Sequence, residues 1–363
     1  MTPSIVQRCA RGTQGVLLWQ RVHPAIESIA RERAATGLAW FFGEDVGARL
    51  RAMPLAQPGP FLPQAIAPML ADSILLGIPM LALITVHAAR PLDEDLPPLV
   101  AALTARGIAF EVVDWDNPDV DWSRFDTAVL RSTWDYIDRF AEFSAWIDRV
   151  EAQTRLLNPA EVVRWNTHKG YLIELAARGI PIVPTRLLRP GERLPPIADG
   201  EWVIKPAIGA GSRDARRFCD DPQGAAAHAQ RLLDSGRDVL LQPYLARVDQ
   251  AGETALIYFG GRYSHAIRKG PLLAPNADAT AKLFAPEQIV ARQPAAEELA
   301  LAERVLAALP FPGSPLYARV DLLRDENGDP VLLELELTEP SLFFPYAQGS
   351  VERFVDALQG LRN

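Results

Sequence analysis

The chain has 363 residues, of which 48% are hydrophobic and 23% charged, as is typical of a globular protein with about one to three domains. Its net charge of −8 argues against a general binder of nucleic acid or of anionic membranes, but leaves room for a local basic pocket. Its two cysteines, Cys9 and Cys219, provide neither a disulfide framework nor a cysteine zinc site. The sequence has no signal-peptide pattern and no apolar run of membrane-spanning length, so we expect a cytoplasmic protein.

Residues 1–79 differ from the rest of the chain because they are rich in proline, alanine and arginine. Prolines interrupt the stretch MPLAQPGPFLPQAIAP too often for a long helix, and an amphipathic helix is expected only around Pro24–Thr36. We expect a peripheral extension, and a start codon upstream of the native one would account for it.

From Met80 onward, strand and helix patterns alternate, which predicts a parallel α/β domain over residues 80–157. The expected strands are Leu81–Val86, Ile108–Asp114 and Asp126–Arg131, and the expected helices are Asp93–Arg106 and Phe140–Ala152.

The sequence RSTWDY follows the last of these strands, and open α/β sheets bind ligands at the carboxyl ends of their strands. Arg131, Ser132, Trp134 and Asp135 are therefore candidate substrate contacts. The alternative is that Trp134 and Tyr136 only cover the sheet.

Two short helices are expected next, over Asn158–Arg164 and Thr167–Arg178. Lys169 falls in the first turn of the second helix, where a lysine is unfavourable to the helix dipole. This placement indicates either a binding role or a solvated side chain.

A short strand, Trp202–Lys205, ends on a lysine and leads into a loop that contains Gly209, Gly211 and Ser212. Small residues let backbone N–H groups approach a phosphate, and lysine adds a compact positive charge. The loop lacks the spacing of a P-loop and of a dinucleotide fingerprint, so a simple hairpin turn is the alternative.

The middle of the chain carries further regular patterns before and after a long stretch without periodicity. A strand at Asp238–Leu241 leads into QPYL, and a hairpin around Gly260-Gly261 ends on Arg268-Lys269. The stretch Gly270–Arg292 has little pattern, and such long loops often act as lids or binding loops. Helices are expected at Pro222–Ser235, at Pro294–Leu309 and from Val351.

A second hairpin is expected over Leu316–Leu323 and Pro330–Leu337, because the turn DENGD between them contains Asn-Gly. Side chains alternate along a strand, so Arg319 shares a face with Asp321, and Glu334 shares a face with Glu336. Clustered carboxylates raise one another's pKa, and a hard cation such as Mg²⁺ relieves their repulsion. The alternative is a solvated acidic surface.

The order of these motifs resembles the ATP-grasp superfamily over Asn158–Phe343, after a preceding α/β domain. The sequences RSTWDY, NTHKGYL, GETALIYFGGRYSHAIRK and LLELELTEPSLFF are most similar to the branch that contains D-cycloserine ligase, within the glutathione-synthetase-like and RimK-like group. The resemblance implies an α/β fold of the α+β ATP-grasp type. In it, a parallel α/β layer precedes two subdomains, residues 158–245 and 246–363, that clasp ATP between antiparallel sheets.

The resemblance also implies a nucleotide site. Lys169 and Lys205 would contact the α- and β-phosphates, and the loop Gly209–Ser212, which includes Gly211, would close over the β- and γ-phosphates. The adenine would lie against Gln242, Tyr244 and Leu245, and the ribose against Glu253.

For the reaction, the resemblance implies that Arg319 together with Arg268 or Lys269 neutralises the transferred phosphoryl group. Asp321, Glu334 and Glu336 would hold one or two Mg²⁺ ions. Many relatives have asparagine where this chain has Glu336, which adds negative charge and leaves a preference for Mn²⁺ open.

The implied activity is that of an ATP-dependent ligase, which activates a carboxylate as an acyl-phosphate and joins it to an amine-like nucleophile. In the D-cycloserine ligase reading, a substrate similar to O-ureido-D-serine supplies its own nucleophile and closes a ring. The alternatives are a ligase that joins two amino acids or modifies a peptide, and a non-catalytic ATP-binding module. The expected partner is a small amino-acid-like molecule, not nucleic acid or membrane, and relatives suggest a homo-oligomer.

Overall fold

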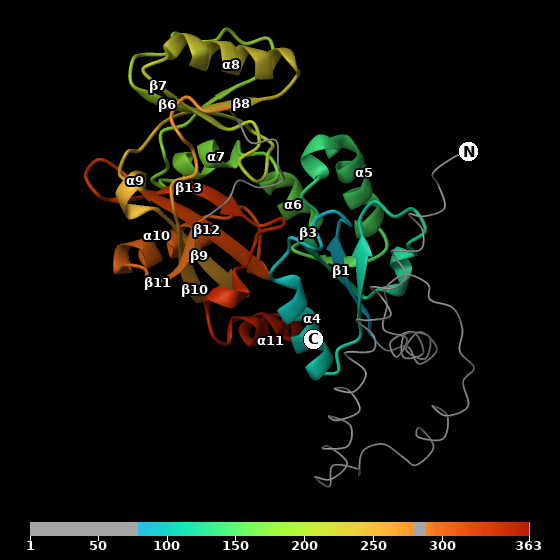
Figure 1. The fold of residues 1–363 in the computed structure, drawn as a ribbon. Coiled ribbons are helices and arrows are strands. Elements are labelled where there is room, and N and C mark those ends of the chain that lie inside the picture. Colours follow the sequence, from blue (N-terminus) through green and yellow to red (C-terminus); the bar gives the residue numbers. More distant parts are fainter. Residues whose placement is uncertain (1–78, 279–287, 363) are drawn as a thin grey trace, which may run out of the picture. The chain divides into compact units, whose positions relative to one another are not determined.

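The computed structural model describes residues 79–278 and 288–362, and the structural statements below concern these two stretches. The extension predicted for residues 1–79, with its helix at Pro24–Thr36, lies outside them apart from residue 79. The described strands form one parallel sheet followed by two antiparallel sheets, coloured from blue to red along the chain in Figure 1. None of the helices in these stretches is both long and apolar enough to cross a membrane.

The parallel sheet has the strand order β2-β1-β3-β4 and confirms the predicted parallel α/β layer. Its strands are β1 (Leu81–Thr85), β2 (Phe110–Asp114), β3 (Thr127–Ser132) and β4 (Arg155–Leu157), and its helices are α4 (Leu96–Ala105) and α5 (Phe140–Glu151). The sequence analysis missed β4, because its three residues are too few for an alternating pattern to be visible.

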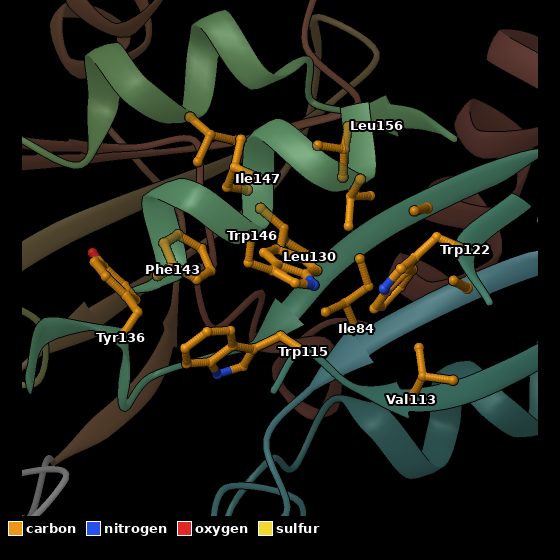
Figure 2. Packing of buried hydrophobic residues seen from close by; sticks show 14 of the residues in the cluster. Ile84, Val113, Trp115, Trp122, Leu130, Tyr136, Phe143, Trp146, Ile147 and Leu156 are labelled. Carbon is orange, nitrogen blue, oxygen red and sulfur yellow. The ribbon is translucent and has the colours of Figure 1, made fainter. Parts of the chain in front are cut away.

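Both faces of this sheet are covered, and all five residues of β1 are therefore buried. Leu81 and Leu83 pack against α4 and the C-terminal helix α11 (Ser350–Arg362). Ala82 and Ile84 pack on the opposite face, in the aromatic cluster of Figure 2. Because successive side chains of a strand point to opposite faces, β1 needs apolar residues at every position when both faces of the sheet are covered.

The aromatic cluster fixes the loop that follows β3. Tyr136 stacks on Phe143 of α5 with ring centroids 4.8 Å apart, and Phe143 contacts Trp115 edge-on at 5.4 Å. These rings lie together below α5 in Figure 2. Aromatic pairs at such distances add to the stabilisation from burial, so the loop is held firmly against the sheet.

The first antiparallel sheet has the order β5-β8-β6-β7, and α8 covers one of its faces (Figure 1). Asp221 caps α8 by accepting the N–H of Gly224, and Pro222 occupies the first helical position, where its missing N–H has no cost. The elements are β5 (Arg186–Leu188), β6 (Glu201–Pro206), β7 (Arg216–Cys219), α8 (Pro222–Asp234) and β8 (Val239–Pro243).

The second antiparallel sheet has the order β11-β10-β9-β12-β13. The predicted hairpin is confirmed, with Gly328 at φ +93° in its turn and Asp325 accepting the N–H groups of Asn327 and Asp329. The strands are β9 (Glu253–Phe259), β10 (Arg262–Lys269), β11 (Ile289–Arg292), β12 (Tyr317–Arg324) and β13 (Pro330–Glu336). The remaining helices are α6 (Ala160–Asn166), α7 (Tyr171–Ala177), α9 (Val248–Ala251) and α10 (Ala296–Ala307).

Two expectations need correction. Lys169 lies before α7, which begins at Tyr171, so its ammonium group does not oppose a helix dipole. The stretch expected to lack pattern, Gly270–Arg292, contains β11, which pairs with β10. Residues 279–287 of that stretch lie outside the described residues.

His265 on β10 connects the second antiparallel sheet to the loop after β13. Its side chain is buried, and Nε2–H donates to the Leu342 carbonyl at 2.9 Å while Nδ1 lies 2.9 Å from the Ser264 hydroxyl. Burial lowers the pKa of His265 to about 4, which the hydrogen bond to Leu342 only partly offsets. The folded state therefore holds this imidazole neutral.

We predict that the free energy of unfolding decreases as the pH falls from about 6.5 towards 4, by up to about 3 kcal/mol from His265 alone. The unfolded chain takes up a proton in this range and the folded chain does not, so acid favours unfolding. His265→Gln retains a hydrogen-bond donor but does not titrate. The free energy of unfolding of this variant, measured by urea titration at pH 7, 6 and 5, should therefore depend less on pH than that of the wild type. An equal dependence of the free energy of unfolding on pH in the two proteins would contradict this assignment.

Candidate active site

A cleft lies between the two antiparallel sheets. On β6, Ile204 packs beneath α8, so the alternate side chains of Val203 and Lys205 line the cleft. Gln242 at the end of β8 lines the same wall. Strand alternation thus places the predicted lysine and glutamine on one surface, opposite the hairpin.

The opposite wall is the hairpin of β12 and β13. Val320 and Leu322 point into the core, so Arg319 and Asp321 line the cleft. The antiparallel register places Arg319 opposite Glu336 and Asp321 opposite Glu334. The predicted gathering of three carboxylates and one arginine on a single face is confirmed.

Ion pairs connect these side chains. The Arg319 guanidinium donates to both carboxylate oxygens of Asp321 at 2.9 Å and also to Glu336. Lys269 Nζ lies 2.9 Å from Asp321 Oδ2 and 2.5 Å from Glu253 Oε1. Each carboxylate therefore meets at least one cation in a largely dry site, where charge–charge interactions are strong.

The balance between burial and neighbouring cations lowers the pKa of some carboxyl groups in this cluster and raises that of others. Burial alone would raise the pKa of Asp321, but Arg319 and Lys269 outweigh it and hold that pKa well below its usual range. For Glu336, burial outweighs Arg319 and raises the pKa to about 7. For Glu253, burial outweighs Lys269 in the same way and the pKa is again about 7. Lys169 and Lys205 likewise outweigh burial at Glu334 and lower its pKa, so Asp321 and Glu334 are the ionised members of the cluster.

The two predicted phosphate lysines reach the cleft from different elements. Lys169 Nζ lies 3.1 Å from Glu334 Oε1 and donates to the Gly209 carbonyl at 2.5 Å. Lys205 has no carboxylate within ion-pair distance in the described part of the chain. Burial, with a further contribution from Lys169, lowers its pKa. An anion bound beside Lys205 would relieve this unfavourable desolvation.

The loop after β6 offers backbone donors beside these lysines. Gly211 and Ser212 adopt φ values of +60° and +59°, and successive N–H groups near such a turn form an anion-binding concavity. Within the two described stretches, the N–H groups of Gly209, Gly211 and Ser212 donate to no protein acceptor. The next residue, Arg213, pairs with Asp138 at 2.6 Å. These unpaired N–H donors lie beside Lys205, which has no ion-pair partner among the described residues, and together they suit the phosphates of a nucleotide.

The far end of the cleft is apolar and suits a flat base. Tyr244 and Leu245, the predicted adenine contacts, lie there, and the Arg217 guanidinium covers the Tyr244 ring at 3.5 Å from its centroid. Gln242 is buried and donates to the Thr185 hydroxyl at 2.8 Å. The sequence analysis missed the apolar residues that complete this end, which are Val183, Val203, Val248, Leu323 and Leu333. Isolated valines and leucines carry no motif, and only the finished fold brings them together.

The structure separates Arg268 from Lys269, which the sequence analysis left as alternatives. Lys269 points into the cleft, whereas Arg268 points to the other side of β10 and donates to the carbonyls of Ala251 and Gln250 at 2.7 and 3.0 Å. Glu253, predicted to bind ribose, lines the cleft but is already paired with Lys269.

No group of three or more His, Cys, Asp or Glu side chains in the described ranges is arranged to hold a metal ion without rearrangement. The physical reason is that Lys169, Lys269 and Arg319 occupy the oxygens of Asp321, Glu334 and Glu336. The donor set itself, carboxylate oxygens only, is the one that Mg²⁺ prefers. The residues therefore fit Mg²⁺ once these cations turn to a bound phosphate chain.

A second pocket opens from the phosphate end of the cleft and shares Lys169, Arg319 and Glu336 with it. Trp134 and Tyr136 from the loop after β3 form its wall, together with Glu339, Ser341 and Phe343. The Trp134 indole donates to the Glu339 carbonyl at 3.0 Å.

The other predicted substrate residues lie outside this second pocket. Arg131 and Ser132 are fully buried, and Arg131 pairs with Asp95 at 3.5 Å. Asp135 accepts the Trp115 indole N–H at 2.8 Å and so supports the loop. Of the four predicted contacts, Trp134 alone lines this second pocket.

Comparison with known proteins decides the family. Residues 81–158 match the family described as D-cycloserine synthetase DcsG, N-terminal domain. Over 297 residues, which are 77% of this chain and 97% of the relative, the chain is 41% identical to the cycloserine biosynthesis protein DcsG of Streptomyces lavendulae. This chain belongs to the D-cycloserine synthetase family of ATP-grasp ligases.

Solved structures agree with this assignment. The crystal structure of D-cycloserine synthetase DcsG is 39% identical and matches with a TM-score of 0.72, over 78% of this chain and all of that one. D-alanine–D-alanine ligase from Bacillus anthracis, at 15% identity and TM-score 0.55, shares the fold over 78% of this chain and 97% of its own. The chain thus shares the fold of this ligase, in agreement with the predicted fold class.

We predict that Lys269→Met lowers the rate of substrate-dependent ADP release by about 100-fold or more, because it removes a cation directed at the phosphate end of the cleft. Arg268→Met is the matched control on the adjacent residue and should remain within about threefold of the wild type. A coupled assay for ADP checks both variants. An equal loss of activity in the two variants would contradict the assignment of Lys269, and not Arg268, to the phosphate end of the cleft.

Proposed function

We propose that this enzyme closes the ring of D-cycloserine from a D-serine derivative similar to O-ureido-D-serine, using ATP and Mg²⁺. The observation that carries the proposal is the second pocket, which encloses about 80 Å³ and joins the nucleotide cleft at Arg319 and Lys169. Its size suits a small amino acid. Its position brings such a substrate's carboxylate to the phosphate end of the cleft.

The reaction needs little covalent chemistry from the protein. Bound ATP supplies the phosphoryl group, and Mg²⁺ neutralises its charge. The substrate carboxylate becomes an acyl-phosphate, and the nitrogen on the substrate's side-chain oxygen displaces phosphate from the carbonyl and loses a proton. For an O-ureido substrate, hydrolysis of the carbamoyl group then releases carbon dioxide and ammonia.

The residues of the chain have distinct tasks in this proposal. Lys205, Lys169 and the N–H groups of the loop Gly209–Ser212 hold the phosphates. Arg319 and Lys269 offset the charge that develops on the transferred group, which is the larger part of catalysis in such reactions.

Asp321, Glu334 and Glu336 are proposed to hold the metal ions. Counting Glu253, the cluster contains four carboxyl groups and the four basic groups Lys169, Lys205, Lys269 and Arg319. With Glu253 and Glu336 only partly ionised, it carries no excess of negative charge without ligand. A triphosphate brings more negative charge than one divalent ion removes, which favours two Mg²⁺ ions. Because the reaction consumes ATP, we place it in the cytoplasm.

The test is product analysis by mass spectrometry after incubation with O-ureido-D-serine, ATP and Mg²⁺. We predict ADP release that depends on this substrate, together with a product of the mass of D-cycloserine. An adduct of two amino acids would instead show a ligase for intermolecular joining. Absence of ADP release with any amino acid would favour a non-catalytic nucleotide-binding module.

We predict that Glu334→Gln lowers kcat by about 100-fold or more, because it weakens a proposed metal ligand. The fold should be retained because an amide of the same shape keeps the packing, although the thermal unfolding midpoint falls because Lys169 loses its charged partner. The exposed turn residue Glu326 supplies the control, because Glu326→Gln removes an equal charge far from the cleft. Wild-type turnover in Glu334→Gln would defeat the metal assignment.

A further inference from the structure

The second pocket contains one carboxyl group without an assigned task, that of Glu339. Its Oε2 atom is shielded from solvent and has no hydrogen-bond partner in the described part of the chain. The Tyr136 hydroxyl donates a hydrogen bond to this carboxyl group. A buried carboxylate oxygen without a donor is unfavourable, so a ligand that brings an N–H group to it gains binding energy.

The surroundings of Glu339 favour a donor that is positively charged. Burial raises the pKa of Glu339 to about 8, and the carboxylates of Glu336 and Glu334 add to this effect while Lys169 opposes it. Without a cation beside it, this carboxyl group is therefore largely protonated at neutral pH. An ammonium group beside Glu339 would favour the ionised form and form a charge-assisted hydrogen bond with it.

Two cations also line this pocket where it joins the nucleotide cleft. Arg319 and Lys169 pair there with Glu336 and Glu334, the proposed metal ligands. Once Mg²⁺ takes these carboxylates, both cations are available to a substrate carboxylate, while Glu339 is available to an ammonium group. The rings of Trp134 and Tyr136 form the wall between, and aromatic faces also attract ammonium groups.

We propose that Glu339 binds the α-ammonium group of the substrate, is held in position by Tyr136, and thereby selects an amino acid over the corresponding carboxylate without the amine. This inference deepens the proposed function and rests on it. The direction of the substrate follows, with its carboxylate at Arg319 and its ammonium group at Glu339.

The test compares O-ureido-D-serine with 3-(ureidooxy)propanoate, which lacks only the α-amine. The ratio of their kcat/KM values measures recognition of the ammonium group. We predict that Glu339→Gln lowers this ratio by about 30-fold or more, because an interaction with a buried charge is lost. The loss should appear in KM for the amino acid, with KM for ATP within about twofold of the wild type.

Two further variants separate recognition from general damage. Tyr136→Phe removes the hydrogen bond that orients the carboxyl group, so it should lower the ratio by less than Glu339→Gln does. Glu303→Gln changes an exposed glutamate on α10 and should leave the ratio unchanged. If Glu339→Gln does not bind a non-hydrolysable ATP analogue, Glu339→Asp replaces it, and its shorter side chain should also lower the ratio.

An unchanged ratio in a variant that still binds nucleotide overturns the inference, as does an equal loss for both substrates. These outcomes are distinct from failure of the proposed function, in which the wild type itself forms no D-cycloserine. If the wild type joins two amino acids instead, the same ratio is measured with the amino acid that supplies the carboxylate and its analogue without the amine. A wild type that turns over no amino acid overturns both proposals.

Discussion

The register between β12 and β13 is the constraint on which the rest of the site depends. It places Arg319 opposite Glu336 and Asp321 opposite Glu334, so four charged groups must share one largely buried face. Such a face is stable only if its charges balance locally. The lysines from other elements provide this balance, because Lys269 pairs with Asp321 and Lys169 with Glu334. A slip of one residue would turn the charges into the core and leave the lysines unpaired.

The same balance prepares the site for its ligands. Every cation that neutralises a carboxylate in the ligand-free cluster is also suited to a phosphate, and every carboxylate is suited to Mg²⁺. Binding of nucleotide with metal therefore exchanges partners within the cluster, and no group is left as an isolated buried charge. Lys205 is the exception in the described structure, since it has no ion-pair partner before ligand arrives. A bound phosphate chain should therefore gain the most binding energy from its contact with Lys205.

Sequence patterns were sufficient for features that depend on local geometry. The Asn-Gly turn and the alternation of β12 and β13 predicted the charged face, because both follow from the backbone of one hairpin. They did not decide between Arg268 and Lys269, since adjacent strand residues face opposite ways and the strand carries a shift in register between Tyr263 and His265. Nor could they show that Arg131 is buried against Asp95, a contact over 36 residues.

Asp95 also connects the N-terminal parallel layer to the wall of the second pocket. Asp95 accepts the backbone N–H groups of Leu342, Phe343 and Phe344, and thereby holds the loop after β13 in place. Phe343 takes a φ of +54°, a strained conformation for a non-glycine residue that such bonds can maintain. This loop carries Ser341 and Phe343 into the second pocket, and the preceding segment carries Glu339. The parallel sheet supplies Trp134 and Tyr136 from its other loop. Since loops of the parallel sheet and of the hairpin form the wall of one small pocket, in the proposed function the parallel layer would help to select the substrate, while the hairpin would neutralise the phosphoryl group and hold the metal.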